Sequence, residues 1–469
     1  MGYDVLGRDD EPLSPTGKLF LQQDFYEVIN CVMGLETSID VEAVKAELKE
    51  SAMIKHPRFC SLLVRDKNGN EHWRKTQVDL DKHLIVLEDR VGEADDEEEV
   101  VNQYMADLAV SSPLATDKPL WEFHFLMAHK CGVLRFHHAL GDGVSFMSLF
   151  LACCKKVGDP NQSPILGASG SSNLSKKSQG NSKAWNFLMV VWYSFLHIIN
   201  FLLKVLWIRD PKTAISGGAG VELWPRKIAI AKLRLKDMKA VKRSVDGATI
   251  NDVLFAIISS GLSRYLHYRT PKVQEELELT AVALVNIRQL PGLQELSDMM
   301  GRFSKSRWGN AIGVYLLPFQ CNKSVATPLD YVKRAKESLD KKKLSLEALF
   351  SHYVIGMTTH FFGSKVASNL YYRLISNTTF LVSNVAGPQE EISFAGHIIK
   401  FLRVNTSSLP HLVGEWWMQA LQVNMVSYAG RADLQIMVAK DIIPDPQFLA
   451  KCFEDSLLEM NDAATNLQS

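Results

Sequence analysis

One abrupt change in composition divides this chain and constrains how it can fold. Residues 158–183 are rich in Ser, Gly, Asn and Lys and have almost nothing to bury, as expected of a flexible linker. Residues 184–203 follow with no formal charge over 20 positions, about the length that an α-helix needs to cross a hydrocarbon core. We therefore predict two folded domains, residues 1–157 and 226–469, joined by a linker and hydrophobic segment at 158–225.

The hydrophobic segment, placed at about residues 184–206, has the flanks of a membrane-associated helix. Trp185 and Trp207 lie near its ends, where indole rings favour a membrane interface. Cations flank the same run, at Lys183, Lys204 and Arg209. Polar residues within it, Asn186 and His197 among them, leave a buried or surface-lying apolar helix as the alternative to a membrane span.

Charge and cysteine content exclude several classes of function. Lys plus Arg equals Asp plus Glu at 52 each, so the chain has no net field to attract nucleic acid. The seven cysteines are odd in number and show no C-x-x-C spacing, so we expect neither a disulfide framework nor a metal site. The first 15 residues are acidic and lack an apolar stretch, which argues against a cleaved secretory signal.

Outside the insert, the hydrophobic patterning is a mixture of α and β. Helices are predicted after Asp40, from Val144 to Phe150, from Thr249 to Leu266 and from Pro446 to Met460. Strands are predicted at 133–136, 277–287, 310–319 and 379–385, and a hairpin at 421–428 and 434–439. The fold class is therefore mixed α/β.

The sharpest chemical feature is the run His137-His138-Ala139-Leu140-Gly141-Asp142-Gly143 at the end of an apolar strand. A histidine at a strand end can present its imidazole to a cleft as a general base. Asp142 lies beyond a tight glycine-flanked turn and cannot comfortably reach back to that imidazole, so we assign it to holding the turn through an Arg elsewhere. The alternative is two loop histidines followed by an Asp helix cap.

Three short runs accompany the run at 137–143, namely Pro119-Leu120-Trp121, Asn251-Asp252 and SNVAGP at 383–388. Together, the four runs resemble motifs of the plant-type wax ester synthase/diacylglycerol acyltransferase family of the CoA-dependent acyltransferase superfamily. The run at 137–143 is similar to that family's HHxxxDG motif, the second to its PLW motif and the third to its ND motif. Residues 383–388 resemble SNVPGP, with Ala386 in place of the common Pro. The resemblance covers most of the chain outside 158–220.

The resemblance implies a two-domain fold with a tunnel between the halves and roles for particular residues. His138 would be the general base, with His137 secondary and Gly143 part of the catalytic motif. Arg288 would be the partner of Asp142, although a surface arginine is the alternative. Asn251 and Trp121 would shape the site or bind substrate. Trp121 is also explained as a core aromatic, and Asp252 as half of a capping box with Thr249.

By the same resemblance, acyl-CoA is a substrate and no cofactor is needed. His138 would remove the hydroxyl proton of a long-chain fatty alcohol as it attacks the thioester, which makes a wax ester. Diacylglycerol would be a secondary acceptor and would give triacylglycerol. Asn251 or a backbone amide could stabilise the oxyanion, and no covalent acyl-enzyme is expected because no Ser or Cys nucleophile is placed beside His138.

These acceptors reside in bilayers, so membrane lipids are expected partners and the endoplasmic reticulum membrane is the expected location. The plasma membrane is an alternative, and the active site is expected to face the cytoplasm. A single crossing by 184–206 would put His138 and the second half on opposite sides of the bilayer. We therefore expect a re-entrant or surface-lying helix.

Three other functions fit parts of this pattern. The first is an acyltransferase of the same superfamily that acts on small alcohol or amine acceptors, against which the PLW and ND motifs and the apolar insert argue. The second is a peptide-synthetase condensation domain, which normally works beside carrier domains that this chain has no room for. The third is a non-catalytic lipid-binding membrane protein, against which the intact His138, Asp142 and Gly143 argue.

Overall fold

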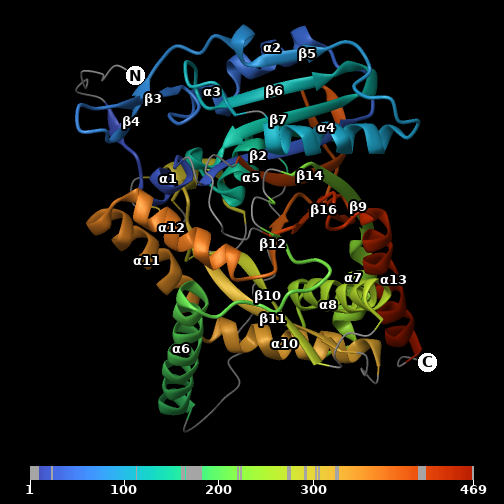
Figure 1. Ribbon diagram of the computed structural model, residues 1–469. Helices are drawn as coiled ribbons and strands as arrows, with labels where there is room; N and C mark the ends of the chain where they lie inside the picture. Colours follow the sequence, from blue (N-terminus) through green and yellow to red (C-terminus); the bar gives the residue numbers. More distant parts are fainter. Residues whose placement is uncertain are drawn as a thin grey trace.

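The computed structural model shows two lobes that face each other across a central interface (Figure 1). It describes residues 10–466 apart from 23–24, 112, 160–163, 165–181, 219–220, 222–223, 272–275, 290–292, 302–303, 305–306, 323–326 and 410–418. Most of the predicted linker at 158–183 therefore lies outside the described residues. Both lobes mix helices and sheet, which confirms the predicted fold class.

The first lobe is built on a mixed seven-stranded sheet in the order β5-β6-β7-β2-β14-β13-β8. Its strands are β2 (Tyr26–Leu35), β5 (Leu84–Leu87), β6 (Trp121–Leu126), β7 (Cys131–His137), β8 (Lys155–Lys156), β13 (Ile392–Phe394) and β14 (His397–Leu409). β7 is buried along its whole length because it lies inside the sheet and has helices or loops on both faces. This position brings the end of β7, and the motif that follows it, to the interface.

Two strands of this sheet come from the C-terminal part of the chain. β14 pairs antiparallel with β2, and Asn30 Nδ2 donates to Asn405 Oδ1 across the pair at 2.9 Å. The predicted separation into domains 1–157 and 226–469 is therefore incomplete, because residues 392–409 return to the first sheet. The physical reason is that β2 would otherwise present an unpaired edge, and strand patterning does not say which sheet a strand joins.

The second lobe has a six-stranded sheet in the order β11-β10-β12-β15-β16-β9. Its strands are β9 (Arg226–Arg234), β10 (Glu276–Asn286), β11 (Ile312–Asn322), β12 (Phe380–Ala386), β15 (Leu421–Tyr428) and β16 (Arg431–Ala439). The predicted hairpin is confirmed by the β15–β16 register. Its turn is made by Ala429 and Gly430, which both have positive φ (44° and 83°), and Gly tolerates this conformation without cost.

Two long helices, α8 (Ile250–Arg269) and α13 (Pro446–Asn466), cover one face of the second sheet. The predicted Thr249–Asp252 capping box begins α8. The two helices approach closely at Gly261, where an added Cβ would lie 2.2 Å from Cδ1 of Phe453. Glycine at this position therefore permits the packing that forms the largest apolar core of the protein.

The hydrophobic insert forms helix α6 (Ser182–Leu206), which projects from the second lobe (Figure 1). Its C-terminal turns pack into the lobe through Phe201 and Val205, which contact an apolar cluster that includes Leu316. Its N-terminal half is largely exposed. By length and composition, Trp185–Leu206 is the helix in the described part of the chain that could cross a membrane.

The remaining elements cover the two sheets and the edge of the first lobe. The further helices are α1 (Pro15–Phe20), α2 (Val41–Glu50), α3 (Ala52–Lys55), α4 (Glu97–Ser111), α5 (Gly143–Ala152), α7 (Leu235–Arg243), α9 (Leu296–Met300), α10 (Pro328–Lys343), α11 (Glu347–Phe362) and α12 (Ser364–Ser376). Short 3₁₀ turns lie at Leu80–Lys82, Met127–His129 and His138–Leu140. A small sheet contains β1 (Glu11–Pro12), β4 (Glu71–Lys75) and β3 (Ser61–Arg65). The Asp40 side chain caps α2 by accepting from the Ala43 amide, as the sequence predicts.

Candidate active site

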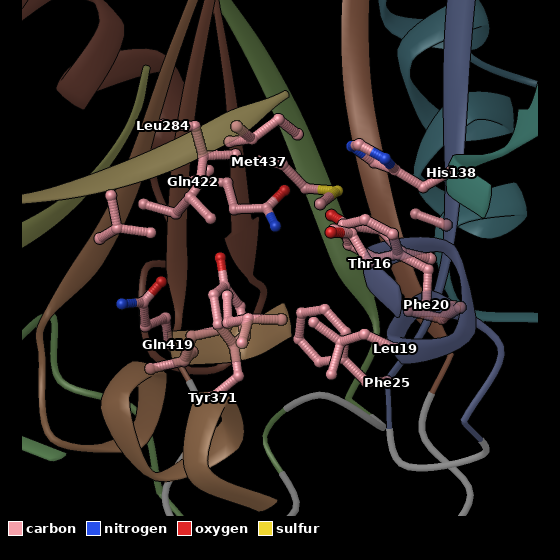
Figure 2. Close-up of a pocket in the computed structure, with 18 of the residues that line it drawn as sticks. Thr16, Leu19, Phe20, Phe25, His138, Leu284, Tyr371, Gln419, Gln422 and Met437 are labelled. Atoms are coloured by element: carbon pink, nitrogen blue, oxygen red, sulfur yellow. The ribbon is translucent and has the colours of Figure 1, made fainter. Parts of the chain in front are cut away.

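The HHALGDG run lies where β7 leaves the first sheet and faces the second lobe. A cavity opens there between the lobes. Figure 2 shows its lining, with His138 on one wall and Tyr371, Gln419 and Gln422 of the second lobe opposite. Phe20 of α1 stacks on the His138 ring with 4.1 Å between ring centroids. The structure thus places His138 in a largely apolar space that both lobes enclose.

Asn310 fixes the orientation and the tautomer of His138. The Asn310 amide donates from Nδ2 to the His138 carbonyl oxygen at 2.8 Å, so its Oδ1 is the atom that faces Nδ1 of the ring, at 3.0 Å. An amide oxygen only accepts, so Nδ1 carries the proton and Nε2 keeps a free lone pair. This arrangement is what a general base needs.

His137 has a structural position. Its side chain is fully buried, and Nδ1 accepts a hydrogen bond from the Ala139 amide at 3.0 Å. Burial, with a smaller contribution from His138, lowers the pKa of His137 to about 3. His137 is therefore neutral and holds the turn that presents its neighbour.

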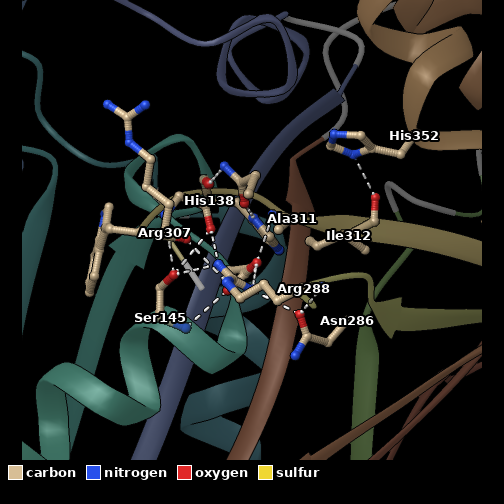
Figure 3. A network of polar contacts seen from close by, with 12 residues as sticks. His138, Ser145, Asn286, Arg288, Arg307, Ala311, Ile312 and His352 are labelled. Carbon is tan, nitrogen blue, oxygen red and sulfur yellow. Dashed lines mark hydrogen bonds and ion pairs between the residues drawn. The ribbon is translucent and has the colours of Figure 1, made fainter. Parts of the chain in front are cut away.

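Asp142 holds the start of α5 and joins the two lobes. Its Oδ1 accepts from the Ser145 amide at 2.9 Å, which caps the helix. Its Oδ2 accepts from Arg288 Nη1 and from the Ala311 amide, both at 2.8 Å (Figure 3). The predicted partnership of Asp142 with Arg288 is present in this geometry, and both carboxylate oxygens bond to groups other than the His138 ring.

Arg288 is the centre of a wider network. Its Nη2 donates to Ser145 Oγ at 2.9 Å and to the Gly309 carbonyl at 2.7 Å, and its Nε donates to the Arg307 carbonyl at 3.1 Å (Figure 3). Ser145 Oγ also donates to Gly309 at 3.0 Å. The hydroxyl is thus committed to the interface and lies outside the cavity lining, so the geometry does not present Ser145 as a nucleophile.

The other predicted site residues support the site from outside the cavity. Gly143 begins α5, and an added Cβ there would lie 3.0 Å from Cγ2 of Val385 in the SNVAGP stretch. Trp121 is fully buried and donates from Nε1 to the Phe59 carbonyl at 3.0 Å, as a core aromatic would. Asn251 accepts from Asn384 at 2.6 Å, so two of the motifs meet, but within the described residues it does not line the cavity. Its role as an oxyanion donor stays a prediction.

Several residues of the site carry no local signal in the sequence. Asn310 and Phe20 lie in segments without a motif, and so does Glu27, a buried side chain of β2 that lines the cavity. Burial raises the pKa of Glu27. A prediction of which segments meet would have been needed to find them, because the Asn310–His138 contact joins residues 172 positions apart.

A second cavity lies beneath α5 inside the first lobe. Its wall is almost entirely apolar and includes Met33, Phe136, Phe146 and Leu149. It reaches Gly143 and Val385, the closely packed pair named above. The motif that carries His138 thus lies between a cavity with polar and apolar walls and one that is almost entirely apolar, and an almost entirely apolar cavity suits alkyl chains.

The sequence matches two family models. Residues 32–193 match the wax ester synthase/diacylglycerol acyltransferase catalytic domain, and residues 308–461 match the WS/DGAT C-terminal domain. Wax ester synthase/diacylglycerol acyltransferase 5 of Arabidopsis thaliana is 35% identical over 485 residues, which covers 96% of this chain and 93% of that protein. The chain belongs to the wax ester synthase/diacylglycerol acyltransferase family.

A second family member and two solved structures are also similar to this chain. Wax ester synthase/diacylglycerol acyltransferase 2 of the same plant is also 35% identical and covers 97% of this chain and 96% of that protein. The solved structure of the wax ester synthase/diacylglycerol acyltransferase from Marinobacter aquaeolei VT8 superposes with a TM-score of 0.58 at 18% identity, covering 97% of this chain and all of that one. A trichothecene 15-O-acetyltransferase from Fusarium sporotrichioides shares the fold, with a TM-score of 0.59 at 13% identity and coverage of 98% and 97%.

Proposed function

We propose that this protein transfers the acyl group of a long-chain acyl-CoA to the hydroxyl of a fatty alcohol, which makes a wax ester. Diacylglycerol is the secondary acceptor and gives triacylglycerol. The observation that carries the proposal is the position of His138 in a mostly apolar cavity between the lobes. Asn310 contacts its Nδ1, and Nε2 has no hydrogen-bond partner among the residues that the structure describes.

The residues then act in the following way. His138 Nε2 takes the hydroxyl proton as the alcohol oxygen attacks the thioester carbonyl, and a tetrahedral oxyanion forms. Collapse of this intermediate breaks the C–S bond, and the CoA thiolate leaves with the proton that His138 returns. Asn251 or a backbone amide is the proposed oxyanion donor. Acyl-CoA is a substrate in this scheme, and no cofactor takes part.

Helix α6 supports a place at a membrane. Membrane lipids are the proposed partners, the endoplasmic reticulum is the proposed location, with the plasma membrane as the alternative, and the active site faces the cytoplasm. The Asp142–Arg288 contact joins the two lobes, so a helix that left them on opposite sides of a bilayer would break it. We therefore favour an α6 that enters the membrane and returns, or lies in its surface.

The test is expression in a host that lacks neutral lipids, followed by separation of wax esters from triacylglycerols. We expect wax ester as the main product and triacylglycerol as a minor one, both absent from the His138→Ala control. Supplying small aromatic alcohols in parallel tests the rival function. Ester formation confined to those acceptors would overturn the proposal.

A further inference from the structure

A stripe of exposed apolar residues follows the outer face of α11. These residues recur three or four positions apart, so they share one face of the helix. Each of them is between 39% and 67% exposed, and along the chain they are Leu346, Leu349, Tyr353, Met357 and Phe361. Phe362, 72% exposed, continues the stripe into the turn before α12. Soluble proteins seldom leave so many large apolar side chains together in water.

This stripe is continuous with the exposed part of α6. The Leu346 amide, at the start of α11, donates to Ser194 Oγ in the middle of α6 at 2.9 Å. Phe201 of α6 and Phe350 of α11 pack edge to face, with 6.0 Å between ring centroids. The two helices therefore belong to one apolar surface, and α6 supplies its longest projection (Figure 1).

The charges around the stripe favour lipid over a protein partner. Residues 344–376 contain one acidic residue, Glu347, and it is buried and paired with Lys342 at 2.7 Å. The exposed cations Lys341 and Lys365 stand before and after the stripe. An apolar stripe without exposed carboxylates and with cations at its ends is the pattern of a helix that lies in a membrane interface.

The inner side of α11 faces the active site. Ile355 lines the cavity that contains His138, together with Tyr371 of α12. Ser351, also on the inner side, is buried and accepts from the Val314 amide at 2.8 Å. One helix thus separates the cavity from the exposed stripe.

We propose that α11 and α6 form a single lipid-contacting surface, in which the outer face of α11 lies at the boundary of headgroups and hydrocarbon. The cavity then stands directly above the bilayer, and an apolar acceptor passes between α11, α12 and α1 without crossing water. This extends the proposed function, because it assumes an acceptor dissolved in the membrane.

The contact is tested on the full chain in phosphatidylcholine vesicles that contain lipids with a spin label on the acyl chain. The Met357→Cys variant carries an environment-sensitive fluorophore. Leu458→Cys on α13, on the opposite side of the second lobe, is the control, because residues 357 and 458 have similar exposures of 59% and 57%. The unmodified chain gives the labelling background of its own cysteines, which are buried apart from the half-buried Cys153.

We expect the spin-labelled lipid to quench the label at position 357 and leave the label at 458 accessible to aqueous iodide. Equal access of iodide to both labels would overturn the proposal. A label at 357 shielded from both quenchers would also overturn it, because a second protein copy would then cover α11.

Activity supplies an independent readout. The variant Tyr353→Gln/Met357→Gln/Phe361→Gln should turn over a long-chain alcohol in vesicles at least about tenfold more slowly, because a surface that concentrates enzyme at its substrate is lost. Its rate with a short water-soluble alcohol should be unchanged, as should both rates of Leu458→Gln. Equal losses with both alcohols would mean that the stripe only stabilises the fold. If the unmodified protein esterifies neither alcohol, the proposed function fails, and the quenching result still decides the surface.

Discussion

Arg288 of the second lobe and Asp142 of the first meet at 2.8 Å with only 2% and 4% of their side chains exposed. A buried ion pair of this kind stabilises little by itself, because desolvation offsets the attraction, but it is costly to break on one side only. The turn that carries His138 is therefore ordered only when the two lobes come together correctly and this pair forms.

Asp142→Ala should lower stability and activity together. The substitution leaves a buried guanidinium without its counter-ion and removes the cap of α5, so we expect a loss of about 3 to 5 kcal/mol in the free energy of unfolding. Denaturant unfolding and ester formation measured on the same preparation check this. In the double variant Asp142→Ala/Arg288→Met, the loss should be smaller than the sum of the single losses. Normal stability with abolished turnover would place Asp142 in the chemistry.

His138→Ala should reduce acyl transfer by about 10²- to 10⁴-fold, the usual size of losing a general base, without unfolding the protein. His137→Ala should cost less activity, because that ring accepts from the Ala139 amide and packs against Tyr26, which are structural contacts. The variants are compared at equal amounts of folded, membrane-bound protein. Near-normal rates for His138→Ala would exclude the mechanism, and equal losses at both positions would contradict the assignment of His138 alone as the base.

Asn310→Ala should reduce kcat about 10- to 100-fold, because the imidazolium that forms as His138 takes the proton loses its hydrogen bond to Asn310. A hydrogen bond to a charged group contributes about 1.5 to 3 kcal/mol. Asn310→Asp instead places a carboxylate against Nδ1, which favours the protonated imidazole. The acidic limb of its pH–rate profile should therefore move to higher pH. A merely structural role for Asn310 would lower the rate and leave the profile in place.

Stability should fall as the pH drops below about 6.5. Burial holds the pKa of His137 at about 3, below the ordinary value of 6.5, so the unfolded chain binds the proton first. The contribution of neutral His137 to the free energy of unfolding is complete above pH 6.5 and is lost as the pH falls toward 3. The free energy of unfolding then changes by at most about 1.4 kcal/mol per pH unit.

Thermal unfolding of the wild type and His137→Gln between pH 7.5 and 5.5 measures this slope. The variant keeps an acceptor for the Ala139 amide and should show the smaller dependence on pH. Burial also lowers the pKa of His56 to about 3 and that of His83 to about 4, so some dependence should remain in the variant. Identical slopes would show that His137 is not the titrating group.

Much of the local structure could be predicted because it depends on neighbouring residues. Residues only a few positions apart predict three such features, which are the capping box at Thr249, the buried run of β10 and the hairpin turn at Ala429. The three helices between Pro328 and Ser376 were not predicted. α11 has apolar residues both toward the cavity and toward its exposed stripe, so it lacks the clear alternation of faces that marks a helix.

The candidate site likewise has parts that the sequence predicts and parts that depend on the packing of distant segments. His138 and Asp142 lie in one motif, and resemblance supplied Arg288, but the contact of Asn310 with His138 depends on where β11 begins in space. The sequence predicts the hydrophobic segment as part of a connection between two folded domains. In the structure, Asn377 Nδ2 donates to the Lys204 carbonyl at 2.7 Å, and Phe201 is part of an apolar core. Removal of the whole helix would therefore expose part of the core of the second lobe to solvent.

The return of β14 to the first sheet has a consequence for how the protein is made. β2 is synthesised long before its partner strand β14, because the hydrogen bond between their asparagines spans 375 positions. Until β14 has been synthesised, one edge of β2 is unpaired and open to wrong partners. The first lobe therefore completes its sheet only after β9 to β12 of the second lobe have been made, so the strands around His138 reach their final pairing only then.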